Sequence, residues 1–443
     1  MHSQDIARAL GQSCPSNFEI TRVVLNSRLV KPGDLFVAIS GNHSDGHHFI
    51  KQAVQSGASA ILCSHAQPNI PVMQWVVSDP CAALTTLAAQ HRAQQTCKVV
   101  AVTGSNGKTT VKEMIAAILP KESFATPGNF NNHLGVPISL IQLKPQHRYA
   151  VFELGANHVG EIAHTVGLVQ PCVTLINNIA PAHLSGFGSI SGVVQAKGEI
   201  YQGLLPHGTA VINDDDVYAH AWDSILVDKK IVRFSLHNPT SVHAIDLRWT
   251  DDHLAGFTLV MPLGQAQIQL KVPGIHMVSN ALAAAACAYA LGLSLRDIVH
   301  GLQNFGGVSG RMTFLPGKNN SIIIDDTYNA NLNSVLAAVD VLSHMSGKRC
   351  LILGDMGELG SAAIEHHQLV GATAREKGIE CLFSCGTHSA ESSKAFGAAG
   401  RHYVGQQELV DAFSAQLDQN TTVLIKGSRS AAMEKIVQQL IKE

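Results

Sequence analysis

The stretch KVVAVTGSNGKTT, residues 98–110, decides the fold of the middle of the chain. A near-continuous β-branched run turns at glycine and opens into the helical pattern VKEMIAAIL. Backbone N–H groups of a glycine-rich turn and of a helix N-terminus form a cradle for phosphate oxygens. Lys108 is placed to reach the β and γ phosphates, and the Thr109 hydroxyl to ligate Mg²⁺. The standard loop has four residues between its glycines, whereas two separate Gly104 from Gly107, so the sequence predicts a shortened nucleotide-binding loop.

The pattern of predicted strands and helices divides the chain into three regions. Residues 1–96 hold short strand-like pieces broken by Gly and Pro, and LTTLAAQHRAQQ is predicted to be a helix leading out of them. Residues 97–312 alternate continuous apolar strands with helices, which is typical of a parallel sheet covered on both faces. Residues 313–443 repeat this alternation with SIIIDD, RCLILGD, CLFSCG and TTVLIKG. We therefore predict an α/β protein with a small α/β N-terminal domain, a central phosphate-loop parallel-sheet ATPase domain and a C-terminal Rossmann-like α/β domain.

The composition limits the partners of the chain. Hydrophobic residues make up 46% of the 443 residues, charged residues 14%, and the formal net charge is −2. This balance contains no basic stripe of the kind that draws a protein to nucleic acid or anionic lipid. The N-terminus lacks a basic segment followed by an apolar run, so no signal peptide is predicted. The longest apolar run, Ala281 to Leu293, is too short to span a bilayer and is expected to form a buried helix.

The cysteines indicate a reducing compartment. All nine are scattered, and the closest pair, Cys381 and Cys385, matches neither a zinc nor a redox spacing. Reduced thiols and a cytoplasmic location are therefore expected. We also expect a monomer.

Two places in the central region carry further chemistry. Glu153 ends the strand YAVFELG, where a carboxylate beside a phosphate loop suits a hard divalent cation, although a charge at a strand end can also be incidental. His183 follows a strand, and Lys197 lies on the next predicted helix. Taken singly, such a histidine or lysine is more often an ordinary surface or core residue. The sequence has no H-E-x-x-H pattern, so a zinc hydrolase is not supported.

Three further positions stand next to predicted strands or helices. Asn280 precedes an alanine-rich helix, and Arg311 closes the second region. Asp326 ends the first strand of the third region, where a carboxylate can hold ribose hydroxyls or cap a helix. The last strand runs into Lys426-Gly427-Ser428-Arg429, whose cations and hydroxyl suit a carboxylate or phosphate, or form a basic loop.

Together these pieces resemble the Mur ligase family, which builds the peptide of peptidoglycan. The resemblance rests on motifs in family order: NSR at 26–28, TGSNGKTT, TPGNFNNHLG, FELGANHVGEI, AHLSGFGS, AKGEI, GRM, DDTYNAN, LGDMGELG and KGSRSAAMEKI. Within the family, GNFNNHLG, YNAN, LGDMGELG and KGSR look like the members that add D-alanyl-D-alanine. Members that add diaminopimelate or lysine more often show a K-G-H-E ending.

The resemblance implies the reaction and its partners. The first domain would bind the UDP part of a UDP-N-acetylmuramoyl tripeptide, the second would bind ATP, and the third would close over both. The γ-phosphate would pass to the terminal carboxylate of the tripeptide, and the amine of D-alanyl-D-alanine would displace phosphate from that acyl phosphate. Two Mg²⁺ ions and basic groups would stabilise the charge that develops.

The resemblance also implies roles for individual residues. Lys108, His183 and Lys197 would be catalytic. Thr109 and Glu153 would hold one Mg²⁺, and His183 and a carbamylated Lys197 the second. The residues implied to bind ATP are Gly104, Ser105, Asn106, Gly107, Lys108, Thr109, Thr110, Asn280, Arg311 and Asp326. The residues implied to bind the other substrates are Ser27, Arg28, Asn131, Asn329, Lys426, Ser428 and Arg429.

Other functions stay open at this point. The chain could be a diaminopimelate- or lysine-adding member of the family, or an amide ligase like a folylpolyglutamate synthase. It could also be a nucleotide-binding protein that senses ATP without catalysis. The metal-ligand candidates and the basic loop of the third region speak against the last alternative.

Overall fold

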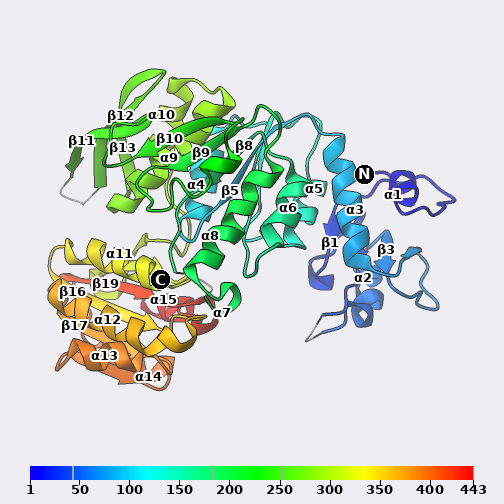
Figure 1. Ribbon diagram of the computed structural model, residues 1–443. Helices are drawn as coiled ribbons and strands as arrows, with labels where there is room; N and C mark the ends of the chain where they lie inside the picture. The colour runs from blue at the N-terminus through cyan, green and yellow to red at the C-terminus, as the bar shows by residue number, and fades with distance from the viewer. Residues whose placement is uncertain (42–43, 182–183, 251–253, 443) are drawn as a thin grey trace.

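The computed structural model describes residues 1–41, 44–181, 184–250 and 254–442. Within these ranges three sheets follow one another along the chain (Figure 1), which confirms the predicted three-domain α/β architecture. Helices cover the sheets and connect most of the parallel strands, as the alternating sequence pattern requires.

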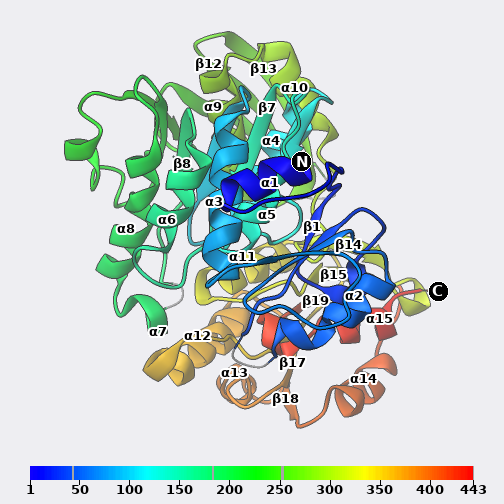
Figure 2. The same ribbon diagram turned by 90° about the vertical axis from the view of Figure 1, so that its right-hand side faces the viewer.

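The first sheet is small and parallel, in the order β1-β2-β3-β4. Its elements are β1 (Val23–Val24), β2 (Leu35–Val37), β3 (Ala60–Cys63), β4 (Met73–Val76), α1 (Ser3–Ala9), α2 (Ile50–Gln55) and α3 (Pro80–Ala93). Because side chains alternate along a strand, Phe36 packs with Ile50 of α2, while Leu35 packs in the cluster that contains Leu84 of α3. Helix α3 confirms the predicted exit helix and runs between this sheet and the central domain (Figures 1 and 2).

The central sheet has nine strands in the order β13-β12-β11-β10-β9-β8-β5-β7-β6. They are β5 (Lys98–Thr103), β6 (Ser123–Ala125), β7 (Tyr149–Glu153), β8 (Val173–Ile176), β9 (Thr209–Asn213), β10 (Lys230–Ser235), β11 (Val242–Trp249), β12 (Leu254–Met261) and β13 (Gly264–Pro273). Strands β5 to β11 pair in parallel, as predicted. The antiparallel extension through β12 and β13 was not predicted, and it follows from the tight turn between Met261 and Gly264, which cannot connect parallel strands.

Helices pack on both faces of the central sheet. They are α4 (Lys108–Ile118), α5 (Gly135–Ile141), α6 (Glu161–Val169), α7 (Leu184–Phe187), α8 (Ile190–Gly198), α9 (Ile275–Leu291) and α10 (Leu295–Asn304). Val100 and Val102 of β5 pack with α4 and α9, whereas Val99 and Ala101 pack in the cluster that contains α5 and α6. Residues 281–286 of α9, five alanines and Leu282, are fully buried, which confirms the predicted buried helix.

The third sheet has the order β14-β15-β19-β16-β17-β18, with only β14 antiparallel. Its elements are β14 (Thr313–Pro316), β15 (Ile322–Asp326), β16 (Lys348–Gly354), β17 (Cys381–Cys385), β18 (Gly400–Tyr403), β19 (Thr421–Lys426), α11 (Leu332–Ser343), α12 (Ala363–Glu376), α13 (Ala390–Phe396), α14 (Gln406–Ser414) and α15 (Glu434–Leu440). The last strand, β19, inserts between β15 and β16, so Asp326 stands opposite Lys426. Helix α11 faces the central domain (Figure 1), and its Ala338 belongs to the same buried cluster as α9.

The expectation of reduced thiols throughout is wrong for one pair. Cys350 of β16 and Cys381 of β17 stand opposite each other in parallel register and form a disulfide. Their separation of 31 residues conceals the pairing in the sequence. The other seven cysteines, all within the described ranges, are free.

No helix in the part of the chain that the structure describes is long and apolar enough to cross a membrane.

Candidate active site

A cavity of about 540 Å³ is lined by the ends of several central strands and by the third sheet. Thirteen residues predicted from the sequence line this cavity, ten from the central region and three from the third region. Those predicted site residues that line it are Ser105, Asn106, Gly107, Lys108, Thr109, Thr110, Asn131, Glu153, Asn280, Arg311, Asp326, Asn329 and Lys426. The carboxyl ends of parallel strands meet at one edge of a sheet, which explains why distant motifs converge here.

The shortened loop between β5 and α4 has a fixed shape. Gly107 has a φ of 77°, and a Cβ there would lie 2.5 Å from Asn177 Nδ2 and 2.6 Å from Asn280 Oδ1, so no other residue fits. Asn178, which the sequence did not single out, accepts a hydrogen bond from Asn106 N at 2.8 Å and donates one to Asn106 O at 3.1 Å. The loop is therefore held from behind, with its open side toward the cavity.

Lys108 turns back onto its own loop. Its Nζ donates to Gly104 O at 2.7 Å and to Ser105 O at 3.2 Å. Burial lowers the pKa of Lys108, an effect that Glu153 opposes and Arg311 reinforces. Phosphate oxygens in the cavity would offer this amine charged acceptors in place of the two carbonyls.

A cluster of oxygen atoms lies beside the loop. Thr109 Oγ1 donates to Glu153 Oε2 at 2.7 Å, and Asn131 Nδ2 donates to Glu153 Oε1 at 2.7 Å. Glu153 is 2% exposed, at the tip of β7. Arg311 Nη2 donates to Thr109 Oγ1 at 2.9 Å, and the guanidinium stacks over Tyr328 at 4.2 Å from the ring centroid. The carboxylate and hydroxyl are hard ligands of the kind that Mg²⁺ prefers.

Lys197 is buried close enough to the phosphate loop for the charge of Lys108 to affect it. The residue is 2% exposed, and its Nζ lies 5.8 Å from the Phe187 ring centroid. Within the described part of the chain, the one charged group that shifts the pKa of Lys197 is Lys108, which carries a like charge. Burial lowers the pKa of Lys197 well below that of an ordinary lysine, and the charge of Lys108 lowers it further. The predicted ligand His183 lies outside the described residues.

Glu199 anchors the segment that carries Lys197. This buried carboxylate accepts hydrogen bonds from Gly160 N at 2.6 Å and from Ala163 N at 2.9 Å, at the N-terminus of α6. A carboxylate is favourable at a helix N-terminus, where the first N–H groups lack partners inside the helix. The sequence analysis assigned no role to Glu199, whereas the structure shows it fixing the end of α8 against α6.

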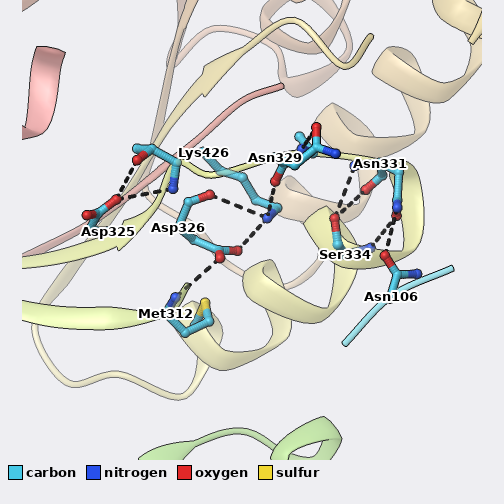
Figure 3. A network of polar contacts seen from close by, with 10 residues as sticks. Asn106, Met312, Asp325, Asp326, Asn329, Asn331, Ser334 and Lys426 are labelled. Atoms are coloured by element: carbon cyan, nitrogen blue, oxygen red, sulfur yellow. Dashed lines mark hydrogen bonds and ion pairs between the residues drawn. The ribbon is translucent and has the colours of Figure 1, made fainter. Parts of the chain in front are cut away.

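The third domain contributes a network of polar contacts (Figure 3). Lys426 Nζ forms an ion pair with Asp326 Oδ2 at 2.5 Å and donates to Asn329 O at 2.9 Å. The other Asp326 oxygen accepts from Met312 N at 3.2 Å. Lys426 and Asp326 were expected to bind different ligands, but here they bind each other.

Asn331 joins the third domain to the phosphate loop. Its Nδ2 donates to Asn106 Oδ1 at 2.7 Å, and its Oδ1 caps α11 by accepting from Ser334 N at 3.0 Å (Figure 3). The sequence analysis missed Asn331 as a site residue. The N-cap signature of Asn before a helix could have indicated its orientation, although not its partner.

Comparisons with known proteins assign the architecture. Residues 19–102 match the sequence model of the Mur ligase family catalytic domain, residues 102–288 the Mur ligase middle domain and residues 310–429 the Mur ligase glutamate ligase domain. The chain belongs to the Mur ligase family.

Individual Mur ligases resemble this chain over nearly its whole length. The UDP-N-acetylmuramoyl-tripeptide–D-alanyl-D-alanine ligase of Escherichia coli is 42% identical over 434 residues, which is 97% of this chain and 96% of the relative. A crystal structure of MurF from Acinetobacter baumannii matches with a TM-score of 0.90 and 36% identity, covering 98% of this chain and 97% of that one. MurF ligase from Thermotoga maritima in complex with ADP matches with a TM-score of 0.80 and 25% identity, covering 95% and 97%.

Some residues predicted from the Mur ligase resemblance do not line the cavity. Ser27 and Arg28 lie in the first domain, where Ser27 Oγ donates to Gln52 Oε1 at 2.9 Å. Ser428 Oγ lies 3.1 Å from Ser430 Oγ, and Arg429 Nη1 pairs with Glu434 Oε1 at 3.0 Å. In this Mur ligase the cavity thus brings Thr109 and Glu153 together with most of the residues predicted to bind ATP. Gly104, Lys197 and these four candidates do not line it.

Proposed function

We propose that this Mur ligase joins D-alanyl-D-alanine to a UDP-N-acetylmuramoyl tripeptide in peptidoglycan synthesis, in a reaction driven by ATP. The observation that carries the proposal is a full-length likeness, at 42% identity, to a relative named for that reaction. The cavity supports it, because it combines a phosphate loop, a buried carboxylate and third-domain groups. Peptidoglycan is the polymer of the bacterial cell wall, so this reaction would contribute to cell shape and division.

The residues around the loop fit a nucleotide. Backbone N–H groups at the start of α4, together with Lys108, would hold the β and γ phosphates. Arg311 Nε is buried and has no hydrogen-bond partner among the described residues, so this guanidinium has a donor left for a phosphate oxygen. The ADP complex of the Thermotoga relative agrees with a nucleotide in this family. Asn280 and Asp326 line the same cavity and would contact the rest of ATP.

The chemistry forms and breaks bonds in two steps. The terminal carboxylate of the tripeptide attacks the γ-phosphorus, an O–P bond forms, and ADP leaves. The neutral amine of D-alanyl-D-alanine then attacks the acyl carbon, a C–N bond forms, and inorganic phosphate and a proton leave. Lys108 and Arg311 would hold positive charge beside the phosphoryl oxygens, where preorganised donors lower the barrier most.

The donor sets also fit metal ions. Thr109 and Glu153 would hold one Mg²⁺, and His183 and Lys197 a second. Bound Mg²⁺ supplies positive charge that neutralises phosphoryl oxygens. An ammonium group cannot bind a cation, so Lys197 would serve only as a carbamate, formed when its neutral amine attacks carbon dioxide and releases a proton. The burial of Lys197 and the nearby charge of Lys108 support this, because both favour the neutral amine.

Each domain would take one part of the reaction. Residues 1–96, with Ser27 and Arg28, would bind the UDP part of the precursor, and residues 97–312 would bind ATP. Residues 313–443, with Asn329, Ser428 and Arg429, would help to hold the incoming dipeptide. Because both ATP and the UDP-linked precursor are nucleotide metabolites, we place the enzyme in the cytoplasm. We also propose that it acts as a monomer.

A coupled assay of phosphate release tests the proposal. Purified enzyme with ATP, Mg²⁺ and the UDP-linked tripeptide should release phosphate only when D-alanyl-D-alanine is added, and the product should gain that dipeptide in mass. Diaminopimelate, lysine and glutamate serve as alternative amines, each with its own acceptor. Turnover with one of these and not with D-alanyl-D-alanine would replace the proposal with another amide ligase, and binding of ATP without any turnover would make the chain a sensor.

A further inference from the structure

Lys112 is a buried lysine on the phosphate-loop helix that lines no part of the cavity. Its side chain is 0% exposed, one turn after Lys108 on α4. The amine donates to Thr126 O at 2.8 Å and pairs with Glu113 Oε1 at 2.6 Å. Burial of a lysine amine is costly unless its hydrogen bonds are made, so these two partners determine where it sits.

Thr126 connects this amine to the metal-ligand candidate. Its hydroxyl accepts a hydrogen bond from Glu153 N at 3.1 Å, and its own N–H donates to Val151 O at 3.0 Å. Thr126 is 1% exposed, so the Glu153 N–H has no water to replace this acceptor. Lys112 therefore reaches the backbone of Glu153 through one intermediate residue.

Thr126 also begins the loop that reaches the Glu153 carboxylate. This loop leads to Asn131, whose Nδ2 donates to Glu153 Oε1 and whose carbonyl accepts from Gly155 N at 2.9 Å. Glu153 is thus held twice by one loop, at its backbone by Thr126 and at its carboxylate by Asn131. The amine of Lys112 ties the start of that loop to α4, the helix that carries Thr109.

We propose that Lys112 is a positioning residue, which fixes the Glu153 carboxylate against Thr109 through the carbonyl of Thr126. The inference rests on the proposed function, in which Thr109 and Glu153 hold a divalent cation. Groups that orient metal ligands from behind typically change metal affinity or activity by about 10- to 100-fold when they are removed. Loss of Lys112 would free the loop from α4 and leave the buried Thr126 carbonyl without its donor.

The test measures metal binding directly, without turnover. Mn²⁺ is titrated into the full-length enzyme saturated with ADP, and free Mn²⁺ is followed by electron paramagnetic resonance. Lys112→Met and Thr126→Val should each raise the Kd for Mn²⁺ about tenfold or more. Two matched controls should stay within about twofold of wild type: Glu113→Gln, which keeps the Lys112 contact to Thr126, and Thr126→Ser, which keeps the hydroxyl.

The controls separate this inference from the proposed function. Mn²⁺ titrations of Lys112→Met and Thr126→Val that overlay the wild type, even with a lowered melting temperature, would show a purely structural role and overturn the inference. If Lys112→Met does not fold, Lys112→Arg, which keeps a cation but changes its contact to the Thr126 carbonyl, is titrated in its place and judged by the same criterion. Glu153→Ala should lose Mn²⁺ binding, and a wild-type titration for that variant would refute the proposed metal role itself.

Discussion

Two buried lysines, one in the third domain and one in the central domain, have opposite surroundings. Lys426 of the third sheet and Lys197 of α8 are each 2% exposed. Lys426 is paired with the Asp326 carboxylate and the Asn329 carbonyl, whereas Lys197 lies over the Phe187 ring and is affected by the charge of a second lysine, Lys108. A buried charge is stable only with a counter-charge. The comparison teaches that equal burial has different consequences: Lys426 is paired with a carboxylate, whereas burial and the charge of Lys108 lower the pKa of Lys197 and so favour its neutral amine.

The largest expected effect comes from changing Lys197. Lys197→Arg keeps a cation but cannot form a carbamate, so we expect ligase turnover to fall on the order of 10²- to 10³-fold. Lys197→Ala should be equally weak, and added formate or acetate should restore part of the rate by supplying the missing carboxylate. Exposed Lys121→Arg serves as control and should match wild type. An active Lys197→Arg enzyme would remove the distinction between the two lysines.

The second prediction concerns the paired lysine. Lys426→Met leaves Asp326 as a buried charge without its partner, which should lower the free energy of unfolding by about 3–5 kcal/mol. Urea unfolding followed by circular dichroism measures the change. Removing both charges in Lys426→Met with Asp326→Asn should recover part of the loss, because the isolated charge is then gone. Unfolding curves that overlay for wild type and Lys426→Met would mean that the ion pair does not stabilise the third domain.

The sequence predicted those features of the site that arise between residues close together in the chain, and missed contacts between residues far apart in it. The phosphate loop and Glu153 were predicted because a strand, a glycine turn and a helix follow one another locally, and because strand ends converge. The pairing of Lys426 with Asp326 was not predicted, since it depends on β19 inserting beside β15, a strand order that the sequence does not reveal. Asn131 was expected to contact the UDP-sugar, and its bond to Glu153 likewise arises from the tertiary fold.

The same limit applies to the fold. Apolar strands alternating with helices predicted the parallel parts of the central and third sheets, because that pattern is local. The antiparallel strands β12 and β13 were missed because the two residues that connect them, Pro262 and Leu263, lack the Asn-Gly or Asp-Gly pattern that marks a hairpin in a sequence. The Cys350–Cys381 disulfide was missed because only the pairing of β16 with β17 brings the two thiols together.

A third, smaller effect is a pH dependence of stability. The pKa of Lys197 is depressed in the folded protein, so between that pKa and the ordinary lysine pKa the unfolded chain binds more protons. Stability should therefore rise with pH across this window, by at most about 1.4 kcal/mol per pH unit from this residue. Lys197→Met should lack that rise, in urea unfolding series made in metal-free and carbon-dioxide-free buffers. Parallel wild-type and variant curves would show that Lys197 carries its charge in the folded state.

The most direct test of the contrast between the lysines is carbon-13 NMR of the enzyme in ¹³C-labelled bicarbonate with Mg²⁺ and ADP. A carbamate on Lys197 gives a new signal in the wild type that disappears in Lys197→Arg. Because the Lys426 amine is already paired with Asp326, a conservative Lys426→Arg change should leave that signal in place. A wild-type spectrum without the carbamate signal, or a signal that persists in Lys197→Arg, would contradict the account.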